Sequence, residues 1–215
     1  LKERIFPAAA GEKYRDTRWI WLSDEAFSKI STEKAPQGVV SVIKYLDFFR
    51  KMDIIYKEDF FLSQKERAIA LHEVRDPSNL GAVIRSAAAF GIDTVVLSAD
   101  CADIYSPKTV RAAMGSLFRV RVVSVGDFSS FVRAARAAGR RVLSAELSDT
   151  AFPLDRAGLS SDDIVVIGNE GHGVPREISA LCDAGLYIPI TEKAESLNAS
   201  VAASVILWEQ RKGTK

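Results

Sequence analysis

The sequence from residue 69 onward alternates short β-rich runs with segments of helical spacing, and this alternation restricts the possible folds more than any other feature. Runs rich in Val and Ile lie at 69–74, 94–98, 118–125, 141–146, 164–167 and 187–190. Segments with Ala, Leu, Arg and Glu at helical spacing lie at 79–90, 107–114, 128–138, 175–182 and 198–211. Since strands separated by helices pair in parallel, the sequence predicts an α/β fold with a parallel sheet and helices on both faces.

Composition places the chain among ordinary globular proteins. Of its 215 residues 47% are hydrophobic and 27% are charged, and 29 Lys and Arg against 28 Asp and Glu leave a net charge of +1. This balance excludes a strongly charged tail protein and decides nothing about nucleic acid. No apolar stretch approaches the roughly 18 residues of a membrane span, and the charged front lacks the apolar block of a signal peptide. We expect a soluble cytoplasmic protein with no membrane partner.

The first 66 residues lack the alternation and scatter aromatic residues among charged ones. We predict a small α/β piece with a linker at 1–66 and the main domain at 67–215. Because the chain begins with Leu1 rather than Met, we expect the front part to be a remnant. The cysteines, Cys101 and Cys182, have no CxxC spacing and no nearby His pair, so neither a disulfide nor a metal site is predicted.

Ligands of parallel sheets bind beyond the carboxyl ends of the strands, so the loops that follow strands carry the candidate site. The first such loop, at 75–85, contains Asn79 and Arg85. Six residues on a helix separate two side chains by about 240°, unless Asn79 stays in the loop as a cap. A capping Asn79 with a solvated Arg85 explains this segment as well as a functional pair does.

The second loop, at 164–175, runs from a buried strand into three glycines. Such a turn lets a ligand approach the backbone. Its spacing matches neither GxGxxG nor GxxxxGK[ST], and Glu170 inside the turn favours a ligand with donors or positive charge over a phosphate. The structural alternative is that Glu170 caps the next helix. We expect His172 to be an exposed turn residue.

The third loop, at 188–200, carries Ser196 and Asn198 around Leu197. Both polar residues form helix caps, and one cap would suffice. Small residues follow in the last helix, where Ala199, Ala202, Ala203 and Ser204 permit close packing. This face suits a dimer interface or a threaded core.

Taken together, the three loops resemble the motifs of the SpoU (TrmH) family of S-adenosylmethionine-dependent RNA 2′-O-ribose methyltransferases. The motifs are D-P-x-N-x-G-x-x-x-R at 76–85, I-G-N-E-G-x-G at 167–173 and I-P-I-x(5)-S-L-N-A-S at 188–200. The segment 107–116 resembles a further family segment. Residues 23–39 are similar to the end of the substrate-binding domain that precedes the catalytic domain in many relatives.

The resemblance implies a fold, an assembly and a set of site residues. The fold would be the SPOUT fold, in which a C-terminal deep trefoil knot follows the parallel sheet, and the assembly a homodimer. The cofactor S-adenosylmethionine would be held, largely by backbone groups, at Gly168, Ile188 and Leu197. The catalytic residues implied by the resemblance are Asn79, Arg85, Glu170, Ser196 and Asn198.

Arg85 would contact the target phosphate and the 2′-oxygen. The family proposal makes Arg85 the base, but a guanidinium with a pKa above about 12 is a poor base, and stabilisation of the developing alkoxide fits equally well. Glu170 and Asn79 would hold Arg85 and the loops, whereas Ser196 and Asn198 would orient the substrate and the knot.

Two positions depart from the family pattern: Glu192 stands where relatives usually have Gly, and Ala199 where they usually have Val. If Glu192 points into the cofactor pocket, it changes the charge of that pocket.

Three classes of function compete. The first is an RNA ribose methyltransferase acting on 23S ribosomal RNA, with transfer RNA as the alternative substrate and Arg85, Lys108 and Arg111 as candidate RNA contacts. The second is a non-catalytic knotted RNA-binding assembly factor, favoured only by Glu192. The third, a dinucleotide-dependent oxidoreductase, lacks GxGxxG and is disfavoured.

Overall fold

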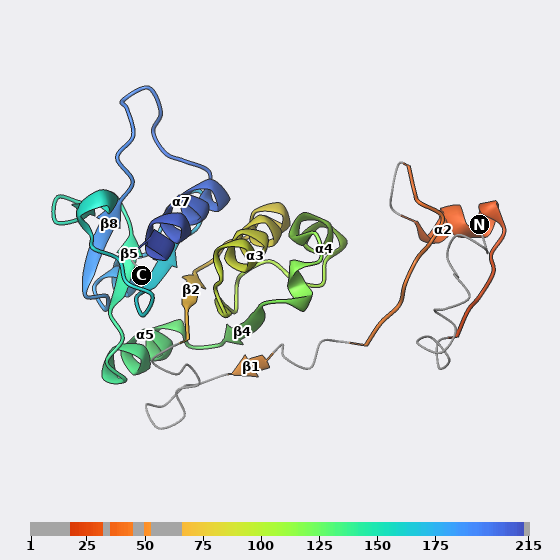
Figure 1. The fold of residues 1–215 in the computed structure, drawn as a ribbon, viewed down its shortest axis with the longest axis horizontal. Coiled ribbons are helices and arrows are strands. Elements are labelled where there is room, and N and C mark those ends of the chain that lie inside the picture. Colours follow the sequence, from red (N-terminus) through yellow and green to blue (C-terminus); the bar gives the residue numbers. More distant parts are fainter. Residues whose placement is uncertain (1–17, 32–34, 45–49, 53–65, 213–215) are drawn as a thin grey trace. The chain divides into compact units, whose positions relative to one another are not determined.

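The computed structural model describes residues 18–31, 35–44, 50–52 and 66–212 (Figure 1). The chain divides into two compact units, residues 1–44 and residues 45–215. In the first unit, helix α2 (Asp24–Ile30) begins at Ser23, whose side chain accepts a hydrogen bond from the backbone N–H of Ala26. The front domain at 1–66 lies partly outside the described residues, so its role in substrate binding stays a prediction.

The second unit is built on an eight-stranded sheet with the order β1-β4-β3-β2-β7-β5-β8-β6. Every neighbouring pair of strands runs parallel, which confirms the predicted sheet. The strands are β1 (Arg50–Met52), β2 (Ala68–Leu71), β3 (Thr94–Ser98), β4 (Arg121–Val125), β5 (Val142–Ala145), β6 (Phe152–Pro153), β7 (Ile164–Ile167) and β8 (Ala184–Tyr187).

Helices cover both faces of the sheet, as predicted, and create two cores (Figure 1). Helices α3 (Pro77–Phe90), α4 (Pro107–Ala113) and α7 (Ala199–Lys212) contribute buried side chains to one core. Helices α5 (Phe128–Ala137) and α6 (Arg176–Ser179) contribute to the other. The central strands β2, β3 and β7 are buried along their whole length, which is why their sequences are continuous apolar runs.

Some element boundaries were predicted wrongly. The strand expected at 187–190 runs at Ala184–Tyr187, where Ala184 pairs with Leu143 of β5, and Pro189, without an N–H, lies beyond its end. The strand expected at 118–125 begins at Arg121, because a 3₁₀ turn occupies Ser116–Phe118. The helix expected at 175–182 is α6, four residues long. Strands β1 and β6, of three and two residues, are too short to show a period.

Helix α3 holds the loops of the site against the rest of the fold. A Cβ atom on Gly81 would lie 2.4 Å from the carbonyl oxygen of Thr109, so only glycine lets α3 and α4 pack this closely. On its other side α3 is joined to α7, where the hydroxyls of Ser86 and Ser204 lie 2.7 Å apart. This packing fits a C-terminal segment folded deep into the domain, and the knot itself stays a prediction.

Candidate active site

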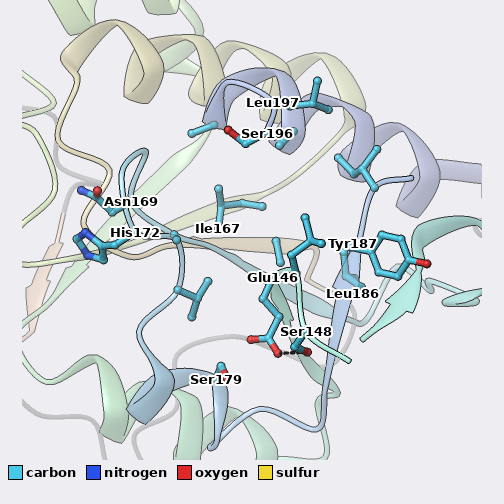
Figure 2. Close-up of a pocket in the computed structure, with 18 of the residues that line it drawn as sticks. Glu146, Ser148, Ile167, Asn169, His172, Ser179, Leu186, Tyr187, Ser196 and Leu197 are labelled. Carbon is cyan, nitrogen blue, oxygen red and sulfur yellow. Dashed lines mark hydrogen bonds between the residues drawn. The ribbon is translucent and has the colours of Figure 1, made fainter. Parts of the chain in front are cut away.

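The carboxyl ends of four neighbouring strands, β2, β7, β5 and β8, meet at one edge of the sheet. The loops after three of these strands, with the start of α7, line a pocket of about 780 Å³ (Figure 2). This volume lies within the range of small-molecule and cofactor sites. The pocket therefore forms where the topology of a parallel sheet places ligands.

Gly168 follows the end of β7 and is the first residue of a tight turn that forms one wall of the pocket. Asn169 and Gly173 bond to each other through both backbone N–H groups, with N–O distances of 3.0 and 2.9 Å. A Cβ atom on Gly168 would lie 2.0 Å from the carbonyl carbon of Gly173 and 2.2 Å from the nitrogen of Val174. No other residue fits there, so Gly168 is what lets the turn fold back this closely on itself beside the pocket.

A chain of side-chain hydrogen bonds joins the three predicted motif loops. The amide of Asn79 donates to Glu170 Oε1 at 3.0 Å, and the amide of Asn198 donates to Asn79 Oδ1 at 3.0 Å. The backbone N–H of Asp76 also points at Glu170 Oε1, at 3.4 Å. Three of the five residues proposed as catalytic thus lie in one connected network.

This network decides between the alternatives left open by the sequence. Asp76, not Asn79, caps α3, because its carboxylate accepts from the backbone N–H groups of Ser78 and Asn79. The same bonds, with that from Ser78 the strongest, lower the pKa of Asp76. Glu170 does not cap α6, which has no side-chain cap. Asn198 caps α7 through Oδ1, which accepts from the N–H of Ser200 at 2.9 Å, and its amide remains for Asn79.

The remaining predicted residues divide into two groups. Gly168, Ile188, Ser196 and Leu197 all line the pocket, so the three residues proposed for the cofactor share one cavity with Ser196. Arg85 does not line it. Arg85 is exposed on α3 and forms no hydrogen bond or ion pair with any residue that the structure describes.

The two departures from the family pattern lie in different places. Glu192 is exposed and is not among the residues that line the pocket, whereas Ala199 is buried and lines it. Glu192 therefore does not meet the condition, a side chain within the pocket, under which it would alter the charge there.

Glu146, which the sequence analysis did not single out, also lines the pocket. Its Oε2 atom accepts from the hydroxyl of Ser144 at 2.9 Å, and its Oε1 atom from the hydroxyl of Ser148 at 3.0 Å. A charged residue at the carboxyl end of a predicted strand (141–146), at the ligand-binding edge of a sheet, is the signal that would have found it. With Glu170 and Glu195 it makes three carboxylates around the pocket, against the guanidinium of Arg176.

Neither the thiol of Cys182 nor a histidine pair offers further chemistry at this edge. Burial, with the charge of Glu146 next, raises the pKa of Cys182 to about 12, so the group stays a protonated thiol. His172 is exposed as expected, with Nε2 3.6 Å from Glu73 Oε2. In the described part of the chain, no three His, Cys, Asp or Glu side chains are gathered as a metal ion would require.

Comparison with known proteins shows the family of this chain. Residues 66–208 match the sequence model of the SpoU rRNA Methylase family. This chain belongs to that family. The match covers β2 to α7 and so contains the whole pocket.

Among the curated relatives whose names specify a reaction are two 23S rRNA methyltransferases. The chain is 33% identical over 190 residues to the 23S rRNA (guanosine(2553)-2′-O)-methyltransferase RlmP of Bacillus subtilis (strain 168), covering 88% of this chain and 71% of that protein. It is 34% identical over 184 residues to the 23S rRNA (uridine(2479)-2′-O)-methyltransferase of Streptomyces viridochromogenes, covering 82% of this chain and 60% of that protein. The chain therefore spans only part of each relative.

Solved structures of the family share the fold. The AdoMet-bound rRNA methyltransferase from Sinorhizobium meliloti superimposes with a TM-score of 0.77 at 30% identity, covering 90% of this chain and 71% of that one. The SpoU methyltransferase AviRb from Streptomyces viridochromogenes, in complex with the cofactor AdoMet, gives a TM-score of 0.65 at 30% identity over 72% of this chain and 63% of that one. No helix in the described part of the present chain is long and apolar enough to cross a membrane.

Proposed function

We propose that this protein is an S-adenosylmethionine-dependent RNA methyltransferase that methylates a ribose 2′-hydroxyl in 23S ribosomal RNA. One observation carries the proposal: the hydrogen-bonded chain from Glu170 through Asn79 to Asn198 ties the three family motifs together beside a pocket of cofactor size. The curated relatives from Bacillus subtilis and Streptomyces viridochromogenes supply the substrate, since both act on 23S rRNA by name.

The residues around the pocket fit the cofactor. Gly168 lines the cavity in a turn too tightly packed to admit a Cβ atom, and Ile188 and Leu197 line the same cavity. These three positions would hold the adenosine part of the cofactor. When bound, S-adenosylmethionine supplies an electrophilic methyl group on a cationic sulfonium.

The protein itself contributes the positioning of the reacting groups and a charge that stabilises the transition state. Asn79, Glu170 and Asn198 hold the loops at fixed distances, and Ser196 faces the pocket from the third loop. Arg85, exposed and unpaired within the described residues, is available for a phosphate and the ribose 2′-oxygen of the RNA. A guanidinium keeps its charge at neutral pH, so we assign Arg85 to stabilising the developing alkoxide rather than to accepting the proton.

Of the alternatives, the non-catalytic assembly factor loses support. The assembly-factor hypothesis depended on Glu192, which lies outside the pocket lining. Transfer RNA remains the second candidate substrate, because a solved structure similar to this chain is described as giving structural insights into the 2-OH methylation of C/U34 on tRNA, with a TM-score of 0.62 at 28% identity. A homodimer and a cytoplasmic location belong to the same proposal.

The test is methyl transfer from labelled S-adenosylmethionine to two purified RNAs, 23S ribosomal RNA and bulk transfer RNA. Label in a ribose-methylated nucleotide of 23S RNA alone is the expected result. Label in transfer RNA alone would replace the substrate, and a protein that binds the cofactor but labels neither would restore the assembly factor.

The Arg85→Ala variant tests the assignment on the substrate side. We expect turnover to fall at least about a hundredfold, since a charge placed at the reacting oxygen is removed, while the dissociation constant for S-adenosylmethionine stays within about twofold. Arg133→Ala, which removes an exposed arginine from α5 on the other face of the sheet, is the matched control. Equal loss of turnover and of cofactor binding in Arg85→Ala would contradict the assignment.

A further inference from the structure

We propose that Glu146 recognises the cationic methionyl half of the cofactor, its sulfonium or its α-ammonium group. This inference rests on the proposed function and assigns a specificity-determining side chain to the same pocket.

The fold delivers the Glu146 carboxylate to the pocket through a close approach to a neighbouring strand. Glu146 follows β5 directly, and its backbone N–H donates to the carbonyl oxygen of Leu186 in β8 at 2.9 Å. The next residue toward the start of β8 is Gly185, on which a Cβ atom would lie 2.7 Å from Glu146 Oε1 and 2.9 Å from its Cγ. The missing side chain at Gly185 therefore makes the space that the carboxylate occupies.

Two hydroxyl groups then hold the carboxylate in one orientation. Ser144 donates to Oε2 at 2.9 Å, and Ser148 donates to Oε1 at 3.0 Å. A carboxylate has about four acceptor sites, so these two bonds leave acceptor capacity for a ligand. In Figure 2, Glu146 and Ser148 lie on one side of the pocket, apart from Ser196 and Leu197.

The carboxylate of Glu146 has no ion-pair partner among the described residues, although the guanidinium of Arg176 also lines the pocket. The side chain is half-buried, and no Lys or Arg there forms an ion pair with it. Withdrawing a charge from water is costly unless an opposite charge compensates. Since serine hydroxyls are neutral, a cation from the ligand is the compensation that the site lacks.

The chemistry of the cofactor meets this requirement in its methionyl half. The sulfonium and the α-ammonium group each carry a positive charge, whereas the adenosine half is neutral. A carboxylate can instead accept hydrogen bonds from the two ribose hydroxyls, as acidic residues do in dinucleotide sites. That alternative predicts a different pattern of ligand binding and is an outcome of the test.

The experiment is calorimetric titration of the wild-type chain and of Glu146→Gln with three ligands. S-adenosylmethionine carries both cationic groups, S-adenosylhomocysteine carries only the ammonium, and 5′-methylthioadenosine carries neither but keeps the ribose. We expect Glu146→Gln to weaken S-adenosylmethionine about tenfold or more and to change methylthioadenosine by less than about twofold, because only a charged partner is lost. Loss confined to S-adenosylmethionine assigns the sulfonium, and equal loss with S-adenosylhomocysteine assigns the ammonium.

Two further variants separate charge from structure. Asp149→Asn removes an exposed carboxylate three residues away that does not line the pocket, and it should bind all three ligands as the wild type does. Glu146→Asp keeps the charge and should retain more affinity for S-adenosylmethionine than Glu146→Gln. Thermal unfolding of each variant verifies that the fold is intact.

The outcomes distinguish this inference from the proposed function. Equal weakening of all three ligands by Glu146→Gln would assign the ribose hydroxyls and overturn the inference, as would unchanged binding of S-adenosylmethionine. In both cases the wild type still binds the cofactor and the proposed function stands. A folded wild type that binds none of the three would overturn both.

Discussion

At the residue scale, the close approach of neighbouring atoms determines which residues can occupy two glycine positions of this site. Gly168 faces the backbone of Gly173 and Val174 at distances that exclude a Cβ atom, and Gly185 leaves space for the carboxylate of Glu146. Gly171, in the same turn as Gly168, has only the side-chain oxygen of Asn169 near it, 3.4 Å from an added Cβ atom. The two glycines of this motif therefore differ: close backbone packing requires a glycine at 168 and does not require one at 171.

Gly168→Ala should destabilise the protein by about 2 kcal/mol or more and abolish measurable cofactor binding, because the backbone of the turn must move to admit the methyl group. Gly171→Ala, with an ordinary contact at most, should stay within about 0.5 kcal/mol of the wild type. Urea unfolding followed by circular dichroism measures both. Similar stability of the two variants would show that the turn adapts without cost.

Glu192→Gly restores the residue usual in the family. Because Glu192 is exposed and outside the pocket lining, we expect the dissociation constant for S-adenosylmethionine to change by less than about twofold, as screening by water and salt predicts. Calorimetric titration decides the point. A severalfold weaker complex in the variant would mean that the loop carries Glu192 to the cofactor on binding.

At the scale of elements, helices α3, α4 and α5 begin at polar caps of residue types that the sequence makes recognisable. Asp76 caps α3, Ser106 caps α4 and Asp127 caps α5, each accepting hydrogen bonds from backbone N–H groups of the first turn. Pro follows directly at the first position of α3 and of α4, where its missing N–H has no cost. These caps place the start of α3, and with it Asn79, at the edge of the pocket.

The cap of α5 provides a pH-dependent contribution to stability. Hydrogen bonds from the hydroxyl and then the backbone N–H of Ser130 lower the pKa of Asp127 in the folded state. The stabilisation is therefore fully present above the usual aspartate pKa near 4 and is lost as the pH falls through the lowered folded value. Asp127→Ala should cost about 1 kcal/mol at pH 7.

Asp127→Asn is the matched control, since an amide oxygen still caps the helix and does not titrate in this range. Its free energy of unfolding should fall less steeply than that of the wild type between pH 5 and the acid limit of folding. Urea unfolding at several pH values measures the difference. Parallel curves for the two proteins would show that the Asp127 cap does not contribute to acid unfolding.

At the scale of the whole molecule, strand order gathers what the sequence separates. The order β2-β7-β5-β8 places loops from residues near 146, 170 and 196 around one pocket, and the loop near residue 76 beside Glu170. The opposite side of α7 is left apolar: Val201, Val205 and Trp208 follow one another at helical spacing and are 47%, 37% and 51% exposed. We assign the interface of the proposed homodimer to this stripe.

Val205→Glu places a charge in the middle of that stripe and should convert a dimer into monomers, because burying an unpaired carboxylate in an interface is unfavourable. Sedimentation velocity across a range of protein concentrations measures the state. Val42→Glu, at a valine that is 96% exposed in the first unit, should leave the dimer unchanged. A wild type that sediments as a monomer would remove the homodimer from the proposal.

Local patterns were sufficient for most of the main domain. Strands at 94–98 and 164–167 coincide with β3 and β7, because fully buried strands must be apolar throughout. Helices α3, α4, α5 and α7 lie within two residues of their predicted bounds, since caps and spacing are written locally. Family membership followed from three ordered motifs and is confirmed.

Contacts between residues far apart in the sequence could not be predicted from local patterns. Asp76 rather than Asn79 caps α3. Strand β8 begins with an alanine and a glycine, which by themselves resemble a turn, and only the pairing with β5 and the approach of Glu146 explain them as strand residues. Glu146 itself belongs to no motif. The sequence by itself determined the alternation, the caps and the motif residues, because each depends on neighbours along the chain. Only the tertiary structure decided which carboxylates face the pocket, because strand order and close backbone packing set that.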